Sequence, residues 1–301
     1  MRFGIKYRYP RVPLSEKLKG YLQLVKPLTL IPPFIAGYIG VVLPLIQLQF
    51  MFLSWKAVFV AISLTLAQAF GQAFNQAYGW HEDTINKPYR PIPSGIVSVS
   101  EAYSISIFLM ALSVWFAYIA DFVIWCILLI FLAMLYNIKL KYSSPWLSLI
   151  LLSFSRGYLP FIACWSVYGN ILVAEPHVIG IVIALWVFAF QPTKDIIDVE
   201  GDKRFGARTL PTVYGIERTK SFIKAAAMMP FIFLCFAIFL GFLGCIYFIF
   251  ALNIFVAMYC IKTLSVSSRY FENTKSWIGF YAGIGMFYIL ALLGYIMEAI
   301  I

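Results

Sequence analysis

Residues 57–83 read AVFVAISLTLAQAFGQAFNQAYGWHED, an apolar run that ends in a histidine and two adjacent carboxylates. Its uncharged part exceeds the roughly 18 residues that suggest a membrane-spanning helix. Residues 84–95 follow as TINKPYRPIPSG and add a lysine, an arginine and three prolines. Charged groups at membrane depth cost from ~2.5 kcal/mol each, so this cluster at the end of a span indicates a functional site.

The composition excludes a soluble globular protein. The chain has 301 residues, is 62% hydrophobic and only 12% charged, and its mean hydropathy is +0.86. We therefore predict an all-α integral membrane protein with about nine transmembrane helices around a central chamber. The predicted spans are 22–46, 57–81, 100–119, 122–138, 146–168, 176–196, 221–241, 243–263 and 276–298.

The positive charges indicate the orientation of these spans. A cytoplasmic N-terminus places nearly every loop cation on the cytoplasmic side and leaves only Lys56 opposite, which is the distribution that membrane insertion favours. The cations on the predicted cytoplasmic side are Arg2, Lys6, Arg8, Arg11, Lys17, Lys19, Lys87, Arg90, Lys139, Lys141, Lys194, Lys203, Arg204, Arg208, Arg218, Lys220, Lys262, Arg269 and Lys275. Topology accounts for the net charge of +10, so we do not predict nucleic-acid binding.

No linker or shift in composition divides the chain, which predicts a single domain over residues 1–301. The basic N-terminal segment lacks the apolar core and the cleavage site of a signal peptide. The five cysteines lie singly within apolar segments, which argues against disulfides and zinc sites.

Two acidic segments end predicted spans on the cytoplasmic side. The first contains Asn75, Glu82 and Asp83, which helical spacing places on one broad face. The second, QPTKDIIDVEGDKRFGARTLP at 191–211, carries Asp195, Asp198 and Asp202 at spacings of three and four. Carboxylates that share a face repel one another, and a divalent cation relieves that repulsion. Oxygen ligands without histidine or cysteine favour Mg²⁺.

Basic residues accompany both acidic segments. Either segment alone could be a solvated loop with a helix cap, but two on one side argue against that interpretation. The accompanying cations are Lys26, Arg90, Lys139, Lys141, Lys194, Lys203 and Arg204. A metal site ringed by cations is what a diphosphate ligand requires.

These residues resemble the signatures of the UbiA superfamily of intramembrane prenyltransferases. The family's first signature, NDxxDxxxD followed by INxPxRPIPSG, is similar to residues 75–95. Its second, KDxxDxxxD followed by GxxTLP, matches Lys194, Asp195, Asp198, Asp202 and the GARTLP stretch. A weaker element, Tyr-x-x-x-Leu-Lys, matches residues 136–141.

The first signature departs from the family at two positions. Gln76 replaces the usual aspartate, and Gly79 replaces the middle aspartate, which is a usual metal ligand. Glu82 is a neighbouring carboxylate and therefore a candidate replacement for the ligand missing at Gly79.

The resemblance implies that an isoprenoid chain moves from a prenyl diphosphate to a lipophilic acceptor, with Mg²⁺ as cofactor. The acceptor would be an aromatic quinone precursor, a porphyrin alcohol-type partner or a prenylglycerol phosphate. We expect an integral protein of a prokaryotic cell membrane whose active site faces the cytoplasm. We expect metal binding by Asn75, Glu82, Asp83, Asp195, Asp198 and Asp202, of which Asp83, Asp198 and Asp202 are the predicted catalytic residues. We expect substrate binding by Lys26, Arg90, Tyr136, Lys141, Arg156, Lys194 and Lys203.

Two other functions fit the same residues. An intramembrane terpene cyclase would use the same metal–diphosphate site without a separate acceptor. An ion transporter would also place charges in its spans, but here they gather on one side and supply no relay through the outer half. Arg156, alone in its span, either binds an anionic acceptor or pairs with a buried carbonyl or carboxylate.

Overall fold

The computed structural model describes residues 12–47, 54–264 and 275–300. Within these ranges every regular element is a helix, and nine helical runs are long and apolar enough to cross a membrane. They cover 27–46, 55–78, 99–119, 123–142, 145–165, 174–197, 216–239, 245–262 and 275–298. The nine predicted spans are thereby confirmed. The predicted tail cations Arg2, Lys6, Arg8 and Arg11, and also Arg269, lie outside the described residues.

Several spans consist of more than one helical element. The elements are α1 Leu14–Val25, η1 Pro27–Leu30, α2 Ile31–Gln47, α3 Trp55–Tyr78, α4 Trp80–Asn86, α5 Val99–Ile119, α6 Val123–Ile138, η2 Leu140–Tyr142, α7 Pro145–Ser153, η3 Phe154–Tyr158, α8 Leu159–Trp165, α9 Ala174–Phe190, η4 Gln191–Ile197, α10 Val199–Arg204, α11 Leu210–Tyr214, α12 Ile216–Ala226, α13 Met229–Phe239, η5 Cys245–Leu252, α14 Asn253–Lys262 and α15 Lys275–Ile300. The element η3 is π-helical, and the other η elements are 3₁₀ helices.

Local sequence signals define where these helices begin. Ser54 caps α3 by accepting a hydrogen bond from the backbone of Ala57. Ser98 and Glu101 form a reciprocal capping box at the start of α5. Such caps satisfy backbone groups that have no partner inside the helix, which matters most where no water is available.

Small residues allow the spans to approach closely. A Cβ on Gly37 in α2 would lie 2.5 Å from the Cα of Ala61 in α3. Large apolar side chains such as Ile124 and Phe239 instead point outward and are more than four-fifths exposed. Small residues between helices and large ones facing outward are the arrangement expected in lipid.

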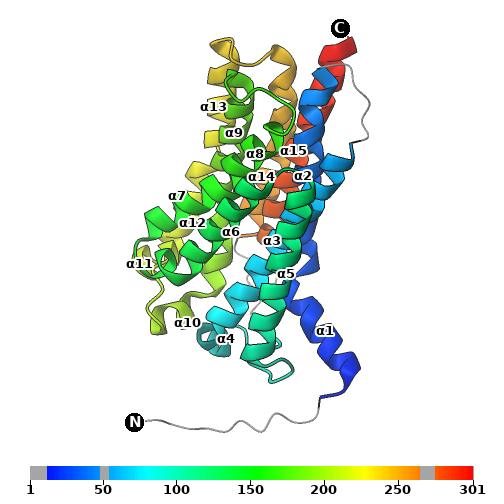
Figure 1. Ribbon diagram of the computed structural model, residues 1–301. Coiled ribbons are helices and arrows are strands. Elements are labelled where there is room, and N and C mark those ends of the chain that lie inside the picture. The colour runs from blue at the N-terminus through cyan, green and yellow to red at the C-terminus, as the bar shows by residue number, and fades with distance from the viewer. Residues whose placement is uncertain (1–11, 48–53, 265–274, 301) are drawn as a thin grey trace.

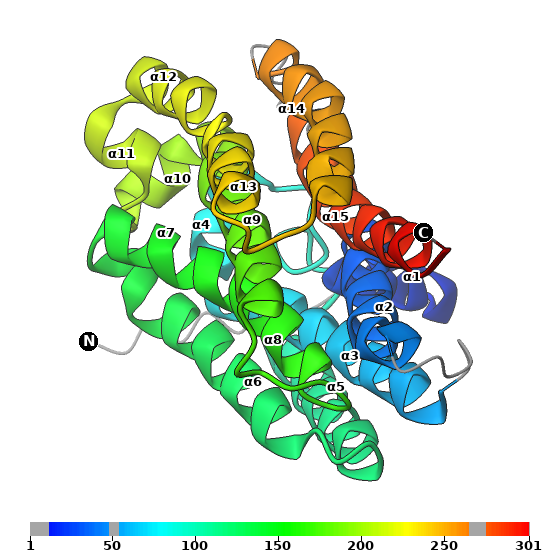
Figure 2. The same ribbon diagram turned by 90° about the horizontal axis from the view of Figure 1, so that it is seen from above.

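We call the end of the bundle that carries α4 and α10 the charged end, because both acidic segments lie there. Figure 1 shows α1, α4 and α10 near the same end, with the last turns of α15 at the other. Viewed along the bundle in Figure 2, α2 and α15 lie side by side, with α6 and α7 across the molecule. The spans between them surround the cavity that is described below.

Candidate active site

The two acidic segments meet at the charged end of the bundle. The first occupies the end of α3 and the short helix α4, and the second runs from η4 into α10. Asn86 accepts a hydrogen bond of 2.7 Å from the backbone N–H of Gly201 and so joins α4 to α10. A Cβ on Gly201 would lie only 2.6 Å from the carbonyl oxygen of Glu82, so the contact requires a glycine.

Ion pairs cross between the two segments. Lys87 donates to Oδ2 of Asp198 at 2.6 Å and also lies 2.5 Å from Oδ1. Lys141, which follows α6, lies 3.3 Å from both Glu82 and Asp202. Each segment therefore contributes carboxylates to one shared site, as the sequence predicts.

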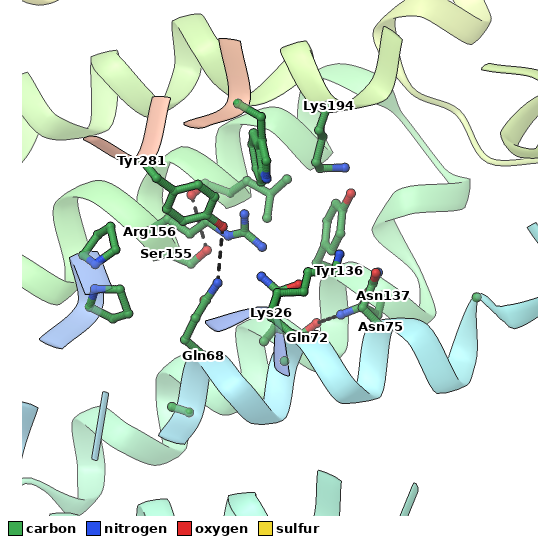
Figure 3. Close-up of a pocket in the computed structure, with 18 of the residues that line it drawn as sticks. Lys26, Gln68, Gln72, Asn75, Tyr136, Asn137, Ser155, Arg156, Lys194 and Tyr281 are labelled. Atoms are coloured by element: carbon green, nitrogen blue, oxygen red, sulfur yellow. Dashed lines mark hydrogen bonds between the residues drawn. The ribbon is translucent and has the colours of Figure 1, made fainter. Parts of the chain in front are cut away.

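A cavity of about 190 Å³ extends from this charged end into the bundle. All the predicted site residues line it except Asp195 and Lys203. Those that do are Lys26, Asn75, Glu82, Asp83, Arg90, Tyr136, Lys141, Arg156, Lys194, Asp198 and Asp202. Figure 3 shows part of this lining, with Lys194, Arg156 and Tyr281 directed into a common space.

Asp195 and Lys203 lie elsewhere. Asp195 forms an ion pair with Lys194 and lines a small neighbouring pocket instead of the main cavity. The expectation that Asp195, Asp198 and Asp202 share one face assumed a continuous α-helix, whereas Asp198 lies at the junction of η4 and α10. Lys203 is exposed on α10.

Arg90 holds Asp83 within the first segment. One guanidinium nitrogen of Arg90 donates to both carboxylate oxygens of Asp83, at 2.8 and 2.7 Å. Both side chains are largely buried. The RPIPSG loop thus folds back over the helix end that precedes it.

A network of amides determines how Asn75 faces the cavity. Asn137 donates its Nδ2 to the carbonyl of Ala133 at 2.8 Å, so its Oδ1 turns toward Asn75. Asn75 donates its own Nδ2 to that oxygen at 2.6 Å. The Oδ1 of Asn75 consequently remains available to the cavity as an acceptor or a metal ligand.

Glu82 occupies the space beside Gly79. A Cβ at position 79 would lie 3.5 Å from Oε2 of Glu82, so the Glu82 carboxylate reaches the place where an aspartate at 79 would begin. Tyr142 donates to Oε1 of Glu82 at 2.5 Å. Glu82 is 4% exposed and does not point into solvent.

Gln76 does not face the site. Its amide donates to the backbone carbonyls of Leu24 and Gln23, at 2.8 and 3.3 Å, and so binds the end of α1. Lys26, the first residue after α1, adopts a left-handed backbone with φ of 50°. This conformation is uncommon for a lysine and costs energy, and it presents Lys26 at the mouth of the cavity.

The chain matches the UbiA prenyltransferase family over residues 30–295. The chain belongs to this family. It is 31% identical over 202 residues to digeranylgeranylglyceryl phosphate synthase of Methanobrevibacter smithii, covering 65% of this chain and 69% of that protein. A UbiA prenyltransferase is an enzyme that transfers prenyl groups, in agreement with the resemblance stated above.

Solved structures share the fold. One, of a digeranylgeranylglyceryl phosphate synthase, is 25% identical and covers 95% of this chain and 99% of its own, with a TM-score of 0.62. Another, a UbiA homolog from Archaeoglobus fulgidus bound to GPP and Mg²⁺, is 20% identical. It covers 92% of this chain and 99% of its own, with a TM-score of 0.69.

Burial and nearby positive charges shift the pKa values of the carboxyl groups of this UbiA protein in opposite directions. Burial opposes ionisation of Glu82, but Lys141 and Tyr142 hold the pKa of Glu82 below its ordinary value. Burial likewise opposes ionisation of Asp198, and the charges of Lys87 and Arg90 keep its pKa lowered. Burial, aided by neighbouring aspartates, raises the pKa of Asp202 to about 6 despite Lys141. All three carboxyls are therefore mainly ionised at neutral pH.

The donor set fits Mg²⁺ shared with a diphosphate. Among the described residues, no three acidic, histidine or cysteine side chains come close enough to form a complete metal cage. Mg²⁺ does not require one, because it usually binds through one or two carboxylates and completes its shell with phosphate and water. Both carboxylate oxygens of Asp198 lie within 2.6 Å of Lys87, so a metal at Asp198 would share this carboxylate with the lysine or displace it.

The sequence interpretation missed several residues of this site. Lys87 was assigned only to topology, although it lies within the INKPYRPIPSG stretch. Asn137 occupies a variable position within the 136–141 element and Tyr142 follows it, but neutral side chains give no charge signal. Eight residues of this site are not predicted from the sequence. Seven of them line the cavity, and Tyr142 donates a hydrogen bond to the lining residue Glu82; they are Gln68, Gln72, Asn86, Lys87, Asn137, Tyr142, Ser155 and Tyr281.

Proposed function

We propose that this protein is an Mg²⁺-dependent prenyltransferase that joins the prenyl group of a prenyl diphosphate to a prenylglycerol phosphate. The observation that carries the proposal is the pairing of carboxylates and cations at one mouth of a single cavity. Carboxylates alone would suit a metal, and cations alone would suit an anion. A metal–diphosphate complex uses both.

The acidic residues would hold the metal. The candidate ligands are the carboxylates of Asp83, Asp198 and Asp202, the amide oxygen of Asn75, and Glu82 in place of the oxygen that Gly79 lacks. One or two of these carboxylates would bind Mg²⁺, and phosphate and water would complete its shell. Bound Mg²⁺ would neutralise the negative charge that develops on the departing diphosphate. Each of these carboxylates already faces a lysine or an arginine, so a diphosphate would exchange one set of ionic partners for another.

The cations would hold the diphosphate. Lys87 and Arg90 from the loop after α4, Lys141 from η2 and Lys194 from η4 line the same mouth. Preorganised positive charge stabilises the leaving group as its bond to the allylic carbon breaks, and an allylic cation remains. The hydroxyl oxygen of the acceptor would then form a bond to that cation and pass its proton to the released diphosphate.

The deeper cavity would protect the cation from water. Ala36, Leu64, Leu129 and Ile284 line this part and come from four different spans. An apolar wall accepts the prenyl chain and excludes water, which would otherwise hydrolyse the intermediate.

The relatives guide the choice of acceptor. A protein named digeranylgeranylglyceryl phosphate synthase makes a glyceryl phosphate with two geranylgeranyl chains, so its acceptor would be the phosphate that carries one chain. We assign the same acceptor class to this protein in preference to an aromatic quinone precursor. We also assign its site to the cytoplasmic face of a prokaryotic cell membrane, from the charge distribution and from the archaeal source of that relative.

One experiment separates this function from its alternatives. Purified protein would be incubated with labelled geranylgeranyl diphosphate, Mg²⁺ and geranylgeranylglyceryl phosphate. Release of pyrophosphate with a doubly prenylated lipid supports the proposal. Pyrophosphate with a cyclic hydrocarbon would indicate a cyclase, and an unreacted diphosphate would favour a transporter.

A further inference from the structure

Arg156 lies in the middle of its span and lines the cavity, where it shares a common space with Lys194 and Tyr281 (Figure 3). Its guanidinium donates one hydrogen bond of 3.1 Å, to Oε1 of Gln191. Across the described ranges, no carboxylate lies within ion-pair distance of it. A charge within a membrane protein is costly without a partner, so this arginine is suited to a ligand that carries the opposite charge.

The backbone around Arg156 directs it inward. Arg156 belongs to the π-helical turn η3, a type of insertion that often occurs at functional sites. The next residue, Gly157, packs so closely on α9 that a Cβ there would lie 2.4 Å from the Cα of Ala184. This contact fixes the turn against α9 and leaves the Arg156 side chain on the cavity side.

A second donor lies beside the guanidinium. The hydroxyl of Tyr281 accepts a hydrogen bond from Gln68 at 3.3 Å, so its own proton remains free to donate. Figure 3 shows the head groups of Arg156, Tyr281 and Gln68 pointing toward one another, with Ser155 nearby. Ser155 donates a long hydrogen bond of 3.5 Å to the carbonyl of Leu152 and would have to turn to reach a ligand. The donors of Arg156 and Tyr281, without a carboxylate beside them, suit an anion with several oxygens.

The spacing relative to the acidic mouth suits the reaction. Gln68 lies seven residues before Asn75 on α3, roughly 10 Å along the helix axis. In a prenylglycerol phosphate the nucleophilic hydroxyl lies on the carbon next to the one that bears the phosphate. A phosphate near Gln68 therefore places that hydroxyl between itself and a diphosphate held near Asn75.

We propose that Arg156, Tyr281 and Ser155 form the subsite for the acceptor's phosphate, separate from the donor's diphosphate site. The inference rests on the proposed function and deepens it. It explains how one cavity distinguishes two phosphorylated lipids: metal and lysines hold the diphosphate, whereas a metal-free arginine site holds the monophosphate. It also predicts that the enzyme selects acceptors by their phosphate.

The test compares two acceptors with the same lipid chain. Geranylgeranylglyceryl phosphate and the dephosphorylated glycerol ether would be supplied with labelled geranylgeranyl diphosphate and Mg²⁺. The wild type should favour the phosphate in kcat/KM by roughly 10- to 100-fold, as expected for hydrogen bonds to a charged group. Arg156→Gln should lose this preference through a raised KM for the phosphate acceptor, with the KM for the diphosphate unchanged.

Two further variants keep the test decisive. Tyr281→Phe removes only the hydroxyl and should reduce the preference by about 3- to 10-fold, even if Arg156→Gln folds poorly. Arg218→Gln removes an exposed arginine on α12 and should change nothing.

Failure of the inference and failure of the proposed function look different. If the wild type uses the phosphate acceptor and both cavity variants keep its preference, the subsite is wrong while the function holds. If both variants lose activity equally on both acceptors, the residues are only structural, and the inference again fails. Transfer by the wild type to a hydroxybenzoate and to neither glycerol ether would overturn the proposed function itself.

Discussion

At the scale of single residues, position 79 shows how a missing side chain can be compensated. The backbone at Gly79 has φ of −94°, which any residue can adopt. The Glu82 carboxylate lies beside the place that a Cβ would occupy. The glycine is therefore not needed for its backbone, and we propose that the Glu82 carboxylate supplies the oxygen ligand that a glycine lacks.

We expect Glu82→Gln to weaken Mg²⁺-dependent binding of prenyl diphosphate about as strongly as Asp83→Asn, because both remove a charged oxygen from the site. Gly79→Asp should partly restore binding to the Glu82→Gln protein, since the new carboxylate fills the same space. Metal titrations of diphosphate binding would measure both effects. A Glu82→Gln titration that overlays the wild type would show that Glu82 is not a ligand.

The ion pair between Asp198 and Lys87 links activity to stability. Asp198→Asn should abolish turnover and also lower the melting temperature, because it leaves the buried Lys87 without its partner at a cost of about 3 kcal/mol or more. Adding Lys87→Gln should recover stability but not activity. Thermal unfolding in detergent and product assays would be measured on the same samples. Full turnover in Asp198→Asn would contradict the metal assignment.

At the scale of elements, hydropathy predicts the spans well, but it does not show where a helix changes type. The nine spans follow from long apolar runs, because lipid leaves the backbone few alternatives. Helical periodicity then assumes continuous α-helices. The breaks at Gly79 and Asp198 and the π-helical turn at Arg156 violate that assumption.

The contact between α4 and α10 provides an element-level prediction. Gly201→Ala should force the two helices apart, because the new methyl group would meet the backbone of Glu82 at 2.6 Å. We expect a large loss of prenyl diphosphate binding without loss of the bundle. Gly285→Ala on α15 is a matched control, since its nearest neighbour is a side-chain carbon at 3.6 Å. Equal binding by the two variants would mean that the segments need not touch.

At the scale of the whole molecule, both acidic segments lie at the end of the bundle near which α1 begins. The sequence predicts this arrangement because the charge distribution assigns every acidic segment to one side. It does not predict the cavity's interior, where Gln68 and Tyr281 are neutral residues in apolar surroundings. Such residues acquire a role only through the neighbours that the fold brings to them.

The orientation of this bundle gives the last prediction. In a protein whose native cysteines are replaced, a cysteine at exposed Thr84 should react with a membrane-impermeant maleimide only from the cytoplasmic side. A cysteine at Leu172, 89% exposed in the loop between α8 and α9, should react only from the opposite side. The two positions lie at opposite ends of the bundle. In inverted vesicles, whose cytoplasmic face is outside, the cysteine at 84 should therefore be labelled and the cysteine at 172 should not. Labelling of Thr84→Cys from outside in intact cells would contradict the predicted topology, and with it the assignment of the diphosphate site to the cytoplasmic face.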